Sequence, residues 1–110
     1  MSSAVTRIAM PDLLAYSISK GAVNTLTYTL AKHLGPRQIT VNAMMPGIID
    51  TDMNAALLQD QGGQQFASGL SVFGRWGQPE DIAEIAAFLA SPDSRWITGQ
   101  LIDASGGSQL

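Results

Sequence analysis

The chain has 110 residues, of which 45% are hydrophobic, and it carries a formal net charge of -3 with only 6 lysine and arginine residues. This length allows one domain with one core and excludes a cofactor-binding domain followed by a separate catalytic domain. The scarcity of basic residues argues against partners such as nucleic acid or an anionic membrane surface, and the absence of cysteine excludes disulfides and thiolate metal sites and favours a cytoplasmic protein.

The first expected element is a long helix from Leu13 to Leu34. Apolar residues recur along it at the four-residue spacing of one helix face, at Leu14, Ile18, Ala22, Leu26 and Leu30. Pro11-Asp12 supplies the helix start and Gly35-Pro36 the stop. A buried strand is expected next, over residues 39–45, because this run is rich in β-branched residues and is bounded by prolines.

The segment from Asp50 to Gly74 is polar and contains glycine in its middle, and we expect a mobile loop that carries some helix. A loop of this length in a compact domain is more often functional or disordered than a plain connection, so it is a candidate lid. A second helix is expected from Pro79 to a stop at Ser91-Pro92, followed by a short strand over residues 100–103. This order predicts an α/β fold with an incomplete parallel sheet.

Tyr16 and Lys20 are four residues apart in the first expected helix, so their side chains project from one face about one turn apart. A nearby lysine ammonium group favours the phenolate form and lowers the pKa of a tyrosine. Such a tyrosine can exchange a proton with a carbonyl or alcohol oxygen while hydride moves at the adjacent carbon. For this pair alone the plainer interpretation, an aromatic edge beside a solvated charge, is the more frequent one.

The surrounding sequence contains further motifs in a fixed order and spacing. They are Ser2-Ser3, Tyr16-Ser17-Ile18-Ser19-Lys20, Ile39-Thr40-Val41-Asn42, Pro46-Gly47 with Thr51, Gly74-Arg75-Trp76-Gly77-Gln78-Pro79-Glu80-Asp81, Ile97-Thr98-Gly99-Gln100 and Gly106-Gly107. Over nearly the whole chain this series resembles the C-terminal half of the short-chain dehydrogenases/reductases. The resemblance implies a Rossmann-like, doubly wound three-layer α/β/α fold and oxidation or reduction of a small-molecule alcohol or ketone with NAD or NADP, without distinguishing the two cofactors.

The resemblance also implies roles for three residues in the chemistry. Tyr16 is expected to be the catalytic acid or base, and Ser3 is expected to hydrogen-bond the reacting oxygen. Lys20 is expected to lower the tyrosine pKa and to hold the ribose of the nicotinamide. Tyr16 and Lys20 therefore count among both the catalytic and the cofactor-binding residues.

Four further residues are implied to bind the cofactor, and one segment to bind the substrate. Pro46 and Gly47 are expected to line the nicotinamide pocket, where a plain strand-ending turn is an equally valid description. The backbone of Ile49 is expected to meet the carboxamide, and Thr51 the carboxamide or the pyrophosphate. Residues 52–73 correspond to the family's substrate-binding loop.

Several family features are missing from the sequence, among them the glycine-rich turn that holds the pyrophosphate at a helix N-terminus, the Asn-Asn-Ala-Gly stretch and the asparagine that completes the family's catalytic tetrad. We therefore expect residues 1–110 to be the C-terminal half of a single Rossmann-like domain, from a truncated chain. The alternative function is a catalytically inactive interaction module. In both cases the helix Leu13–Leu34 is expected to mediate homo-oligomer formation, because its wide apolar face needs a partner.

The remaining noteworthy residues are assigned no chemistry. Asn42 is expected to make structural hydrogen bonds, and His33, the single histidine, is expected at the surface of a helix end rather than in a metal site. Trp76 and Trp96 are expected to pack in the core or at a subunit interface. No apolar stretch reaches the length of a signal peptide core or a membrane span.

Overall fold

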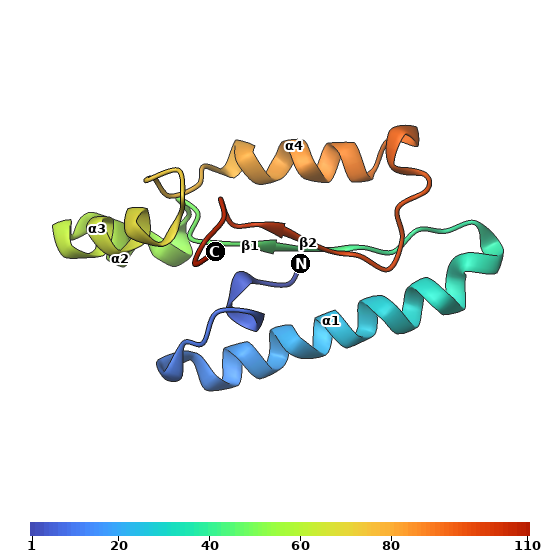
Figure 1. Ribbon diagram of the computed structural model, residues 1–110, viewed down its shortest axis with the longest axis horizontal. Helices are drawn as coiled ribbons and strands as arrows, with labels where there is room; N and C mark the ends of the chain where they lie inside the picture. Colours follow the sequence, from blue (N-terminus) through green and yellow to red (C-terminus); the bar gives the residue numbers. More distant parts are fainter.

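The computed structural model describes residues 1–110 and contains a sheet of two parallel strands. They are β1 (Ala43–Pro46) and β2 (Leu101–Ala104), with Met44 paired to Ile102. Helix α1 (Leu14–Leu34) lies on one side of the sheet and helix α4 (Pro79–Leu89) on the other (Figure 1). Parallel strands need such a crossover connection. The architecture is the three-layer α/β/α arrangement of an incomplete Rossmann-like fold, as predicted.

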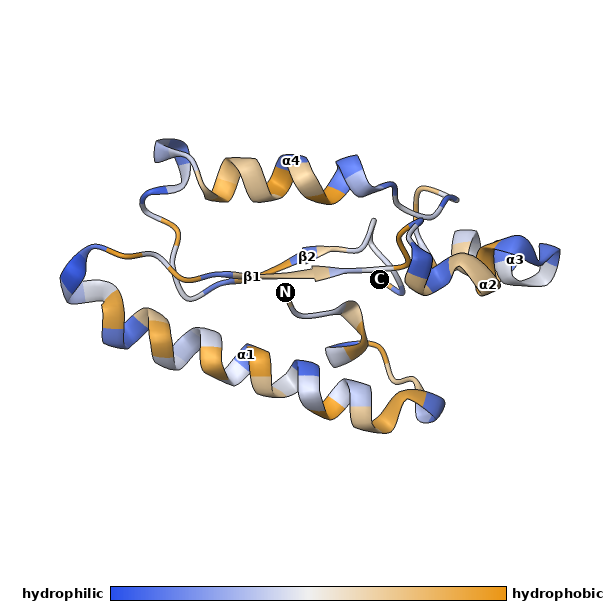
Figure 2. Cartoon of the chain, turned by 180° about the vertical axis from the view of Figure 1, so that it is seen from behind, coloured by the Kyte–Doolittle hydropathy of each residue, from blue (hydrophilic) through white to orange (hydrophobic).

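Helix α1 begins one residue later than predicted, after a 3-10 turn at Pro11–Leu13. Hydrophobic residues recur along its whole length (Figure 2), but the four-residue stripe does not face the sheet. Leu14, Ile18 and Leu26 are 71%, 66% and 53% exposed. The buried residues of the helix are Thr27 and Ala31. The regular stripe that identifies this helix in the sequence is therefore its outer face.

Strand β1 (Ala43–Pro46) starts four residues later than the predicted 39–45. Ile39 is exposed, and upstream of the strand the Val41 N–H donates to the Thr98 hydroxyl at 3.0 Å rather than to a strand backbone. The predicted boundary was wrong because β-branched composition does not show where a neighbouring strand is available for pairing. Strand β2 lies one residue beyond the predicted 100–103.

The segment after β1 contains more helix than predicted. A 3-10 turn at Asp52–Asn54 leads into α2 (Ala55–Gln59), and α3 (Gln61–Leu70) follows almost directly. The Asp60 carboxylate caps α3 by accepting a hydrogen bond from the Gly63 N–H at 3.1 Å. The expectation of a loop with some helix was wrong in extent, because this cap and the packing of α2 against α3 order the polar, glycine-containing stretch. We call residues 52–73 the lid.

Helix α4 begins at Pro79 as predicted and ends at Leu89, just before the predicted stop. Its first turn is closed by a capping box, in which the Asp81 carboxylate accepts a hydrogen bond from the Gln78 N–H at 2.7 Å. Carboxylates in this position also interact favourably with the positive end of the helix dipole. The start of α4 is therefore defined by local sequence.

The core of the chain is small. Only 15 of 110 residues are buried, and the radius of gyration of 15.0 Å exceeds the roughly 13 Å of a compact domain of about this length. The open edge of β1 has one further backbone partner, the Ser2 N–H, which donates to the Met44 carbonyl at 2.9 Å. The prediction of an incomplete sheet is confirmed. No helix combines the length and hydrophobicity that crossing a bilayer would require.

Candidate active site

The first turns of α1, the end of β1 and the lid meet at one end of the sheet (Figure 1). In doubly wound folds the carboxyl ends of the strands are where ligands bind. Tyr16 and Lys20 lie here on one face of α1, with Lys20 Nζ 5.5 Å from the centre of the Tyr16 ring. The ammonium group also donates to the Met1 carbonyl at 3.2 Å. The lysine is thus held beside the tyrosine by the N-terminal segment.

Ser3 is buried and caps the 3-10 turn Ala4–Thr6 through a long hydrogen bond of 3.4 Å from the Val5 N–H to Ser3 Oγ. Its hydroxyl proton is not used in this contact and can be donated elsewhere. The adjacent Ser2 hydroxyl is buried against α1, where it donates to Asn24 Oδ1 at 2.5 Å. The N-terminal segment is therefore fastened to the helix that carries the tyrosine and the lysine.

All seven predicted site residues line one hollow of about 370 Å³, which we call the strand-end hollow. They are Ser3, Tyr16, Lys20, Pro46, Gly47, Ile49 and Thr51. The start of α4 completes the wall with Pro79 and Ile82, and no acidic side chain takes part. The structure therefore brings together side chains that are up to 48 positions apart in the sequence, from Ser3 to Thr51.

A second hollow of about 380 Å³ opens beside the first, and we call it the apolar hollow. Six residues line both hollows, namely Ser3, Tyr16, Pro46, Gly47, Met53 and Asn54. The Tyr16 side chain therefore lies at their junction. The N-terminal wall of the apolar hollow was not predicted from the sequence, although the apolar residues Val5, Ile8 and Met10 between Ser3 and Tyr16 are a signal that could have indicated it.

The backbone around Ile49 is positioned by Gly77, which the sequence analysis left without a role. The Gly77 N–H donates to the Ile48 carbonyl at 2.9 Å, and the Gly77 carbonyl accepts from the Asp50 N–H at 2.9 Å. A Cβ atom on Gly77 would lie 2.4 Å from Ile49 Cδ1. A larger residue at this position would therefore require the end of the Ile49 side chain to move, while the backbone pairing itself holds the chain after β1.

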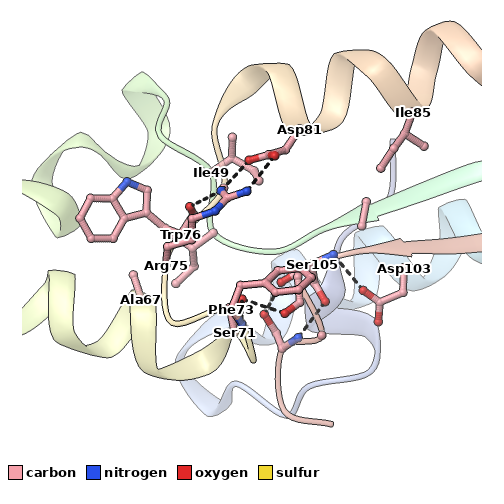
Figure 3. A pocket seen from close by; sticks show the side chains of 16 residues that line it. Ile49, Ala67, Ser71, Phe73, Arg75, Trp76, Asp81, Ile85, Asp103 and Ser105 are labelled. Carbon is pink, nitrogen blue, oxygen red and sulfur yellow. Dashed lines mark hydrogen bonds and ion pairs between the residues drawn. The ribbon is translucent and has the colours of Figure 1, made fainter.

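A third hollow of about 380 Å³ contains neither Tyr16 nor Lys20 (Figure 3). At its edge the Arg75 guanidinium pairs with the Asp81 carboxylate at 2.7 Å. The hydrogen bond from Arg75, followed by that from the Gln78 N–H, lowers the pKa of Asp81 to about 2. The pair remains open to solvent, and it connects the segment that follows the lid to α4 rather than contributing to the chemistry at Tyr16.

For the residues that were assigned no chemistry, some of the predictions agree with the structure and others do not. Asn42 does make structural bonds, donating to the Ile97 carbonyl at 2.9 Å and accepting from the Gln100 N–H at 3.1 Å. Trp96 is 95% exposed, so it does not pack in the core of this chain, and its expected place at a subunit interface stays a prediction. Trp76 is half-buried beside the third hollow, and His33 is exposed at the end of α1.

The fold and the site together define a Rossmann-like α/β protein with a tyrosine, a lysine and a serine at its strand ends. The family model described as enoyl-(acyl carrier protein) reductase matches residues 1–109. The chain belongs to the short-chain dehydrogenase/reductase family, a family of oxidoreductases.

Known relatives resemble this chain along almost its whole length. An uncharacterized oxidoreductase of Methylorubrum extorquens is 44% identical over 110 residues, which cover 97% of this chain and 44% of that protein. A trihydroxynaphthalene reductase of Colletotrichum orbiculare is 39% identical over 109 residues, covering 90% of this chain and 39% of that protein. The crystal structure of the angucycline C-6 ketoreductase LanV with bound NADP is 48% identical with a TM-score of 0.90, covering 96% of this chain and 40% of LanV. The chain thus spans less than half the length of these relatives.

Proposed function

We propose that this chain carries the proton-transfer site of an NAD- or NADP-dependent reaction between a secondary alcohol and a ketone. The observation that carries the proposal is the junction of the two hollows at Tyr16 and Ser3. A hydride donor and its acceptor must lie side by side at the group that moves the proton, and two adjoining hollows meet this requirement. The names of two relatives, a trihydroxynaphthalene reductase and a ketoreductase, support ketone reduction as the direction.

The proposed chemistry assigns one task to each of three side chains. In reduction, the Tyr16 hydroxyl donates its proton to the ketone oxygen, and in oxidation the phenolate takes the proton back. The Lys20 ammonium group, 5.5 Å from the ring, stabilises the negative charge that the phenol acquires. Ser3 donates its free hydroxyl proton in a hydrogen bond to the same oxygen, which holds the ketone and stabilises charge that develops on it.

The strand-end hollow has the chemistry expected of a nicotinamide-ribose site. Lys20 offers ammonium donors for ribose hydroxyls, and Thr51 offers a further hydroxyl group. Pro46 and Gly47 give it a wall without charge, and the backbone of Ile49 can meet an amide. When bound, the nicotinamide supplies or accepts the hydride. Nothing in these residues separates NAD from NADP.

Binding of the cofactor tests the proposal directly. We expect NADH or NADPH to bind the purified protein saturably, with quenching of tryptophan fluorescence as the measurement. Lys20→Ala is expected to weaken this binding by roughly tenfold to a hundredfold, because hydrogen bonds from a charged group contribute about 1.5–3 kcal/mol. Lys32→Ala is the matched control, since Lys32 lies on the same helix, is exposed and does not line the hollow. Equal binding by the Lys20 variant and the control would contradict the assignment.

The second candidate function is an interaction module without catalysis, and it is supported by the outer face of α1. Leu14, Ile18, Leu26 and Tyr28 are all more than half exposed there, and apolar surface of this kind favours association. We propose self-association through this face whether or not the site is active. A protein that sediments as a dimer and binds neither NADH nor NADPH would favour the module over the enzyme.

Two further expectations remain predictions. A cytoplasmic location still depends on the absence of cysteine. The assignment of residues 1–110 to one half of a single domain depends on the resemblance of motifs. Both can be examined in the natural protein by fractionation of cells and by limited proteolysis.

A further inference from the structure

The lining and the volume of the apolar hollow indicate which class of substrate the protein binds. Its lid side is formed by Met53, Leu57, Phe66 and Leu70, and its opposite side includes Val5 and Met10 from the N-terminal segment. No Asp, Glu, Lys, Arg or His side chain lines it. A hollow that is lined by Tyr16 and by these two apolar walls is suited to the carbon skeleton of a ketone.

Few polar groups in the apolar hollow are available to a ligand. The Asn54 amide already donates to the Ile49 carbonyl at 2.8 Å, and the Ser108 hydroxyl donates to the Ser105 carbonyl at 2.7 Å. The hydroxyl groups of Ser3 and Tyr16 and the Asn54 amide oxygen remain, and all three residues line both hollows. The side-chain polar groups that a ligand could use are thus confined to the end shared with the strand-end hollow, and the walls formed by Met53, Leu57, Phe66 and Leu70 offer none.

The nearest cations do not alter this conclusion. Lys20 lines the strand-end hollow but not the apolar hollow. Arg7 is close in sequence to the N-terminal wall, but its guanidinium pairs with the Asp103 carboxylate at 2.9 Å. A carboxylate or a phosphate in the apolar hollow would lose its hydration without gaining a cation, and a sugar would bury hydroxyl groups without partners.

We propose that the substrate is an uncharged ketone or secondary alcohol with an apolar skeleton of about two to three fused rings. This inference rests on the proposed function. The size follows from the volume, because a cavity of about 150 Å³ accommodates benzene and the apolar hollow measures about 380 Å³. Met10 and Met53 are among the lining residues, and methionine side chains make favourable contacts with aromatic rings. Phe66 is the side chain expected to select for such rings.

The test measures binding of three probes to the purified protein by saturation-transfer NMR without cofactor. The probes are 2-tetralone, an uncharged bicyclic ketone; 2-naphthoate, a bicyclic carboxylate; and dihydroxyacetone, a polar ketone. We expect saturable binding of 2-tetralone and binding of the other two that is weaker by about tenfold or more. Equal or tighter binding of 2-naphthoate or dihydroxyacetone would overturn the proposed substrate class, as would absence of 2-tetralone binding.

Variants locate the binding and separate this inference from the catalytic one. Phe66→Ala is expected to weaken 2-tetralone binding by about tenfold or more. Phe88→Ala, at a phenylalanine of similar exposure (44% against 47% for Phe66) outside the hollow, is expected to have no effect. Phe66→Lys is expected to shift preference toward 2-naphthoate. An unchanged affinity in both Phe66 variants would overturn the inference. Binding that follows the expected pattern in a protein that fails to bind NADH and NADPH would contradict the proposed function only.

Discussion

The two sides of the apolar hollow are held in place in different ways. On the α1 side, Tyr16 belongs to a helix of 21 residues, and polar contacts fasten the N-terminal segment to that helix, including the Ser2 hydroxyl on Asn24 at 2.5 Å. On the lid side, two short helices present apolar side chains, and their arrangement depends on α2 packing against α3 at Gly63. The reactive groups Ser3 and Tyr16 are on the well-anchored side, and Phe66, the side chain expected to select for rings, is on the other.

This difference suggests a division of labour between the two sides. Proton transfer needs donor and acceptor within a fraction of an ångström of a productive geometry, which a long helix with hydrogen-bonded neighbours maintains. Selection of a skeleton needs only a wall of suitable shape and polarity, which a short helical lid supplies and can vary. Changes on the α1 side should therefore affect turnover, and changes on the lid side should affect affinity and stability.

The largest effect is expected on the α1 side, from Tyr16→Phe. This variant removes the proton donor while keeping the ring, and loss of a general acid or base lowers kcat by roughly 100- to 10,000-fold. Oxidation of NADPH or NADH by 2-tetralone in the purified protein is the measurement. Tyr28→Phe serves as the control, because Tyr28 is on the same helix, is 53% exposed and lines neither hollow. A kcat in Tyr16→Phe equal to that of the control would remove the tyrosine from the chemistry.

A smaller effect of a different kind is expected on the lid side, from Gly63→Ala. A Cβ atom on Gly63 would lie within 1.9 Å of the Leu57 carbonyl oxygen, so α2 and α3 must separate. Overpacking of this kind costs about 1–3 kcal/mol. Urea unfolding and the KM for 2-tetralone measure the loss of stability and of the apolar wall, while kcat should change little.

Gly69→Ala is the matched control for the lid, because a Cβ atom at Gly69, also on α3, meets nothing within 4 Å. Alanine is favoured over glycine in the middle of a helix by about 0.5–1 kcal/mol, and we expect a gain of at most this size at Gly69, which lies in the last turn of α3. The two variants should therefore have effects of opposite sign. If both stabilise the protein, the close approach at Gly63 does not determine how the lid is held.

The smallest effect is expected where the lid connects to α4, from Asp81→Asn. The hydrogen bond from Arg75 lowers the folded-state pKa of Asp81 from 3.8 to about 2, so the carboxylate stabilises the fold fully above pH 3.8. This contribution is lost as the pH falls through about 2. We expect a slightly lower Tm for the variant at neutral pH and a difference that shrinks as the pH falls from 3.8 toward about 2 and disappears below that, measured by thermal unfolding. A Tm difference that grows as the pH falls would contradict this prediction, because it would mean that the pKa of Asp81 is raised in the folded protein.

Two helices, and the set of residues that line the candidate site, could be predicted from the sequence. Helix α4 has local signals at both ends, with Pro79 at its first position and Pro92 beyond its stop. The spacing of Tyr16 and Lys20 places them on one helix face in any fold. The gathering of seven residues around one hollow was expected from the family resemblance and not from the spacing of any pair.

Several features could not be predicted because they depend on which chain segments come close together. The polar stretch around Gly63 has the composition of a loop, and its order comes from contact with Leu57 and from the Asp60 cap. The role of Gly77 becomes visible only when its backbone pairs with the chain around Ile49. The exposure of Trp96 likewise depends on which surfaces the fold covers.

The sequence by itself determined the α/β class, the two long helices and the shared helix face of Tyr16 and Lys20, because periodicity, capping and spacing act over a few residues. The tertiary structure decided which face of α1 turns outward, where β1 begins, how the lid folds, and that two hollows meet at Tyr16. These features depend on burial and close approach between segments far apart in the chain, and composition does not record such contacts.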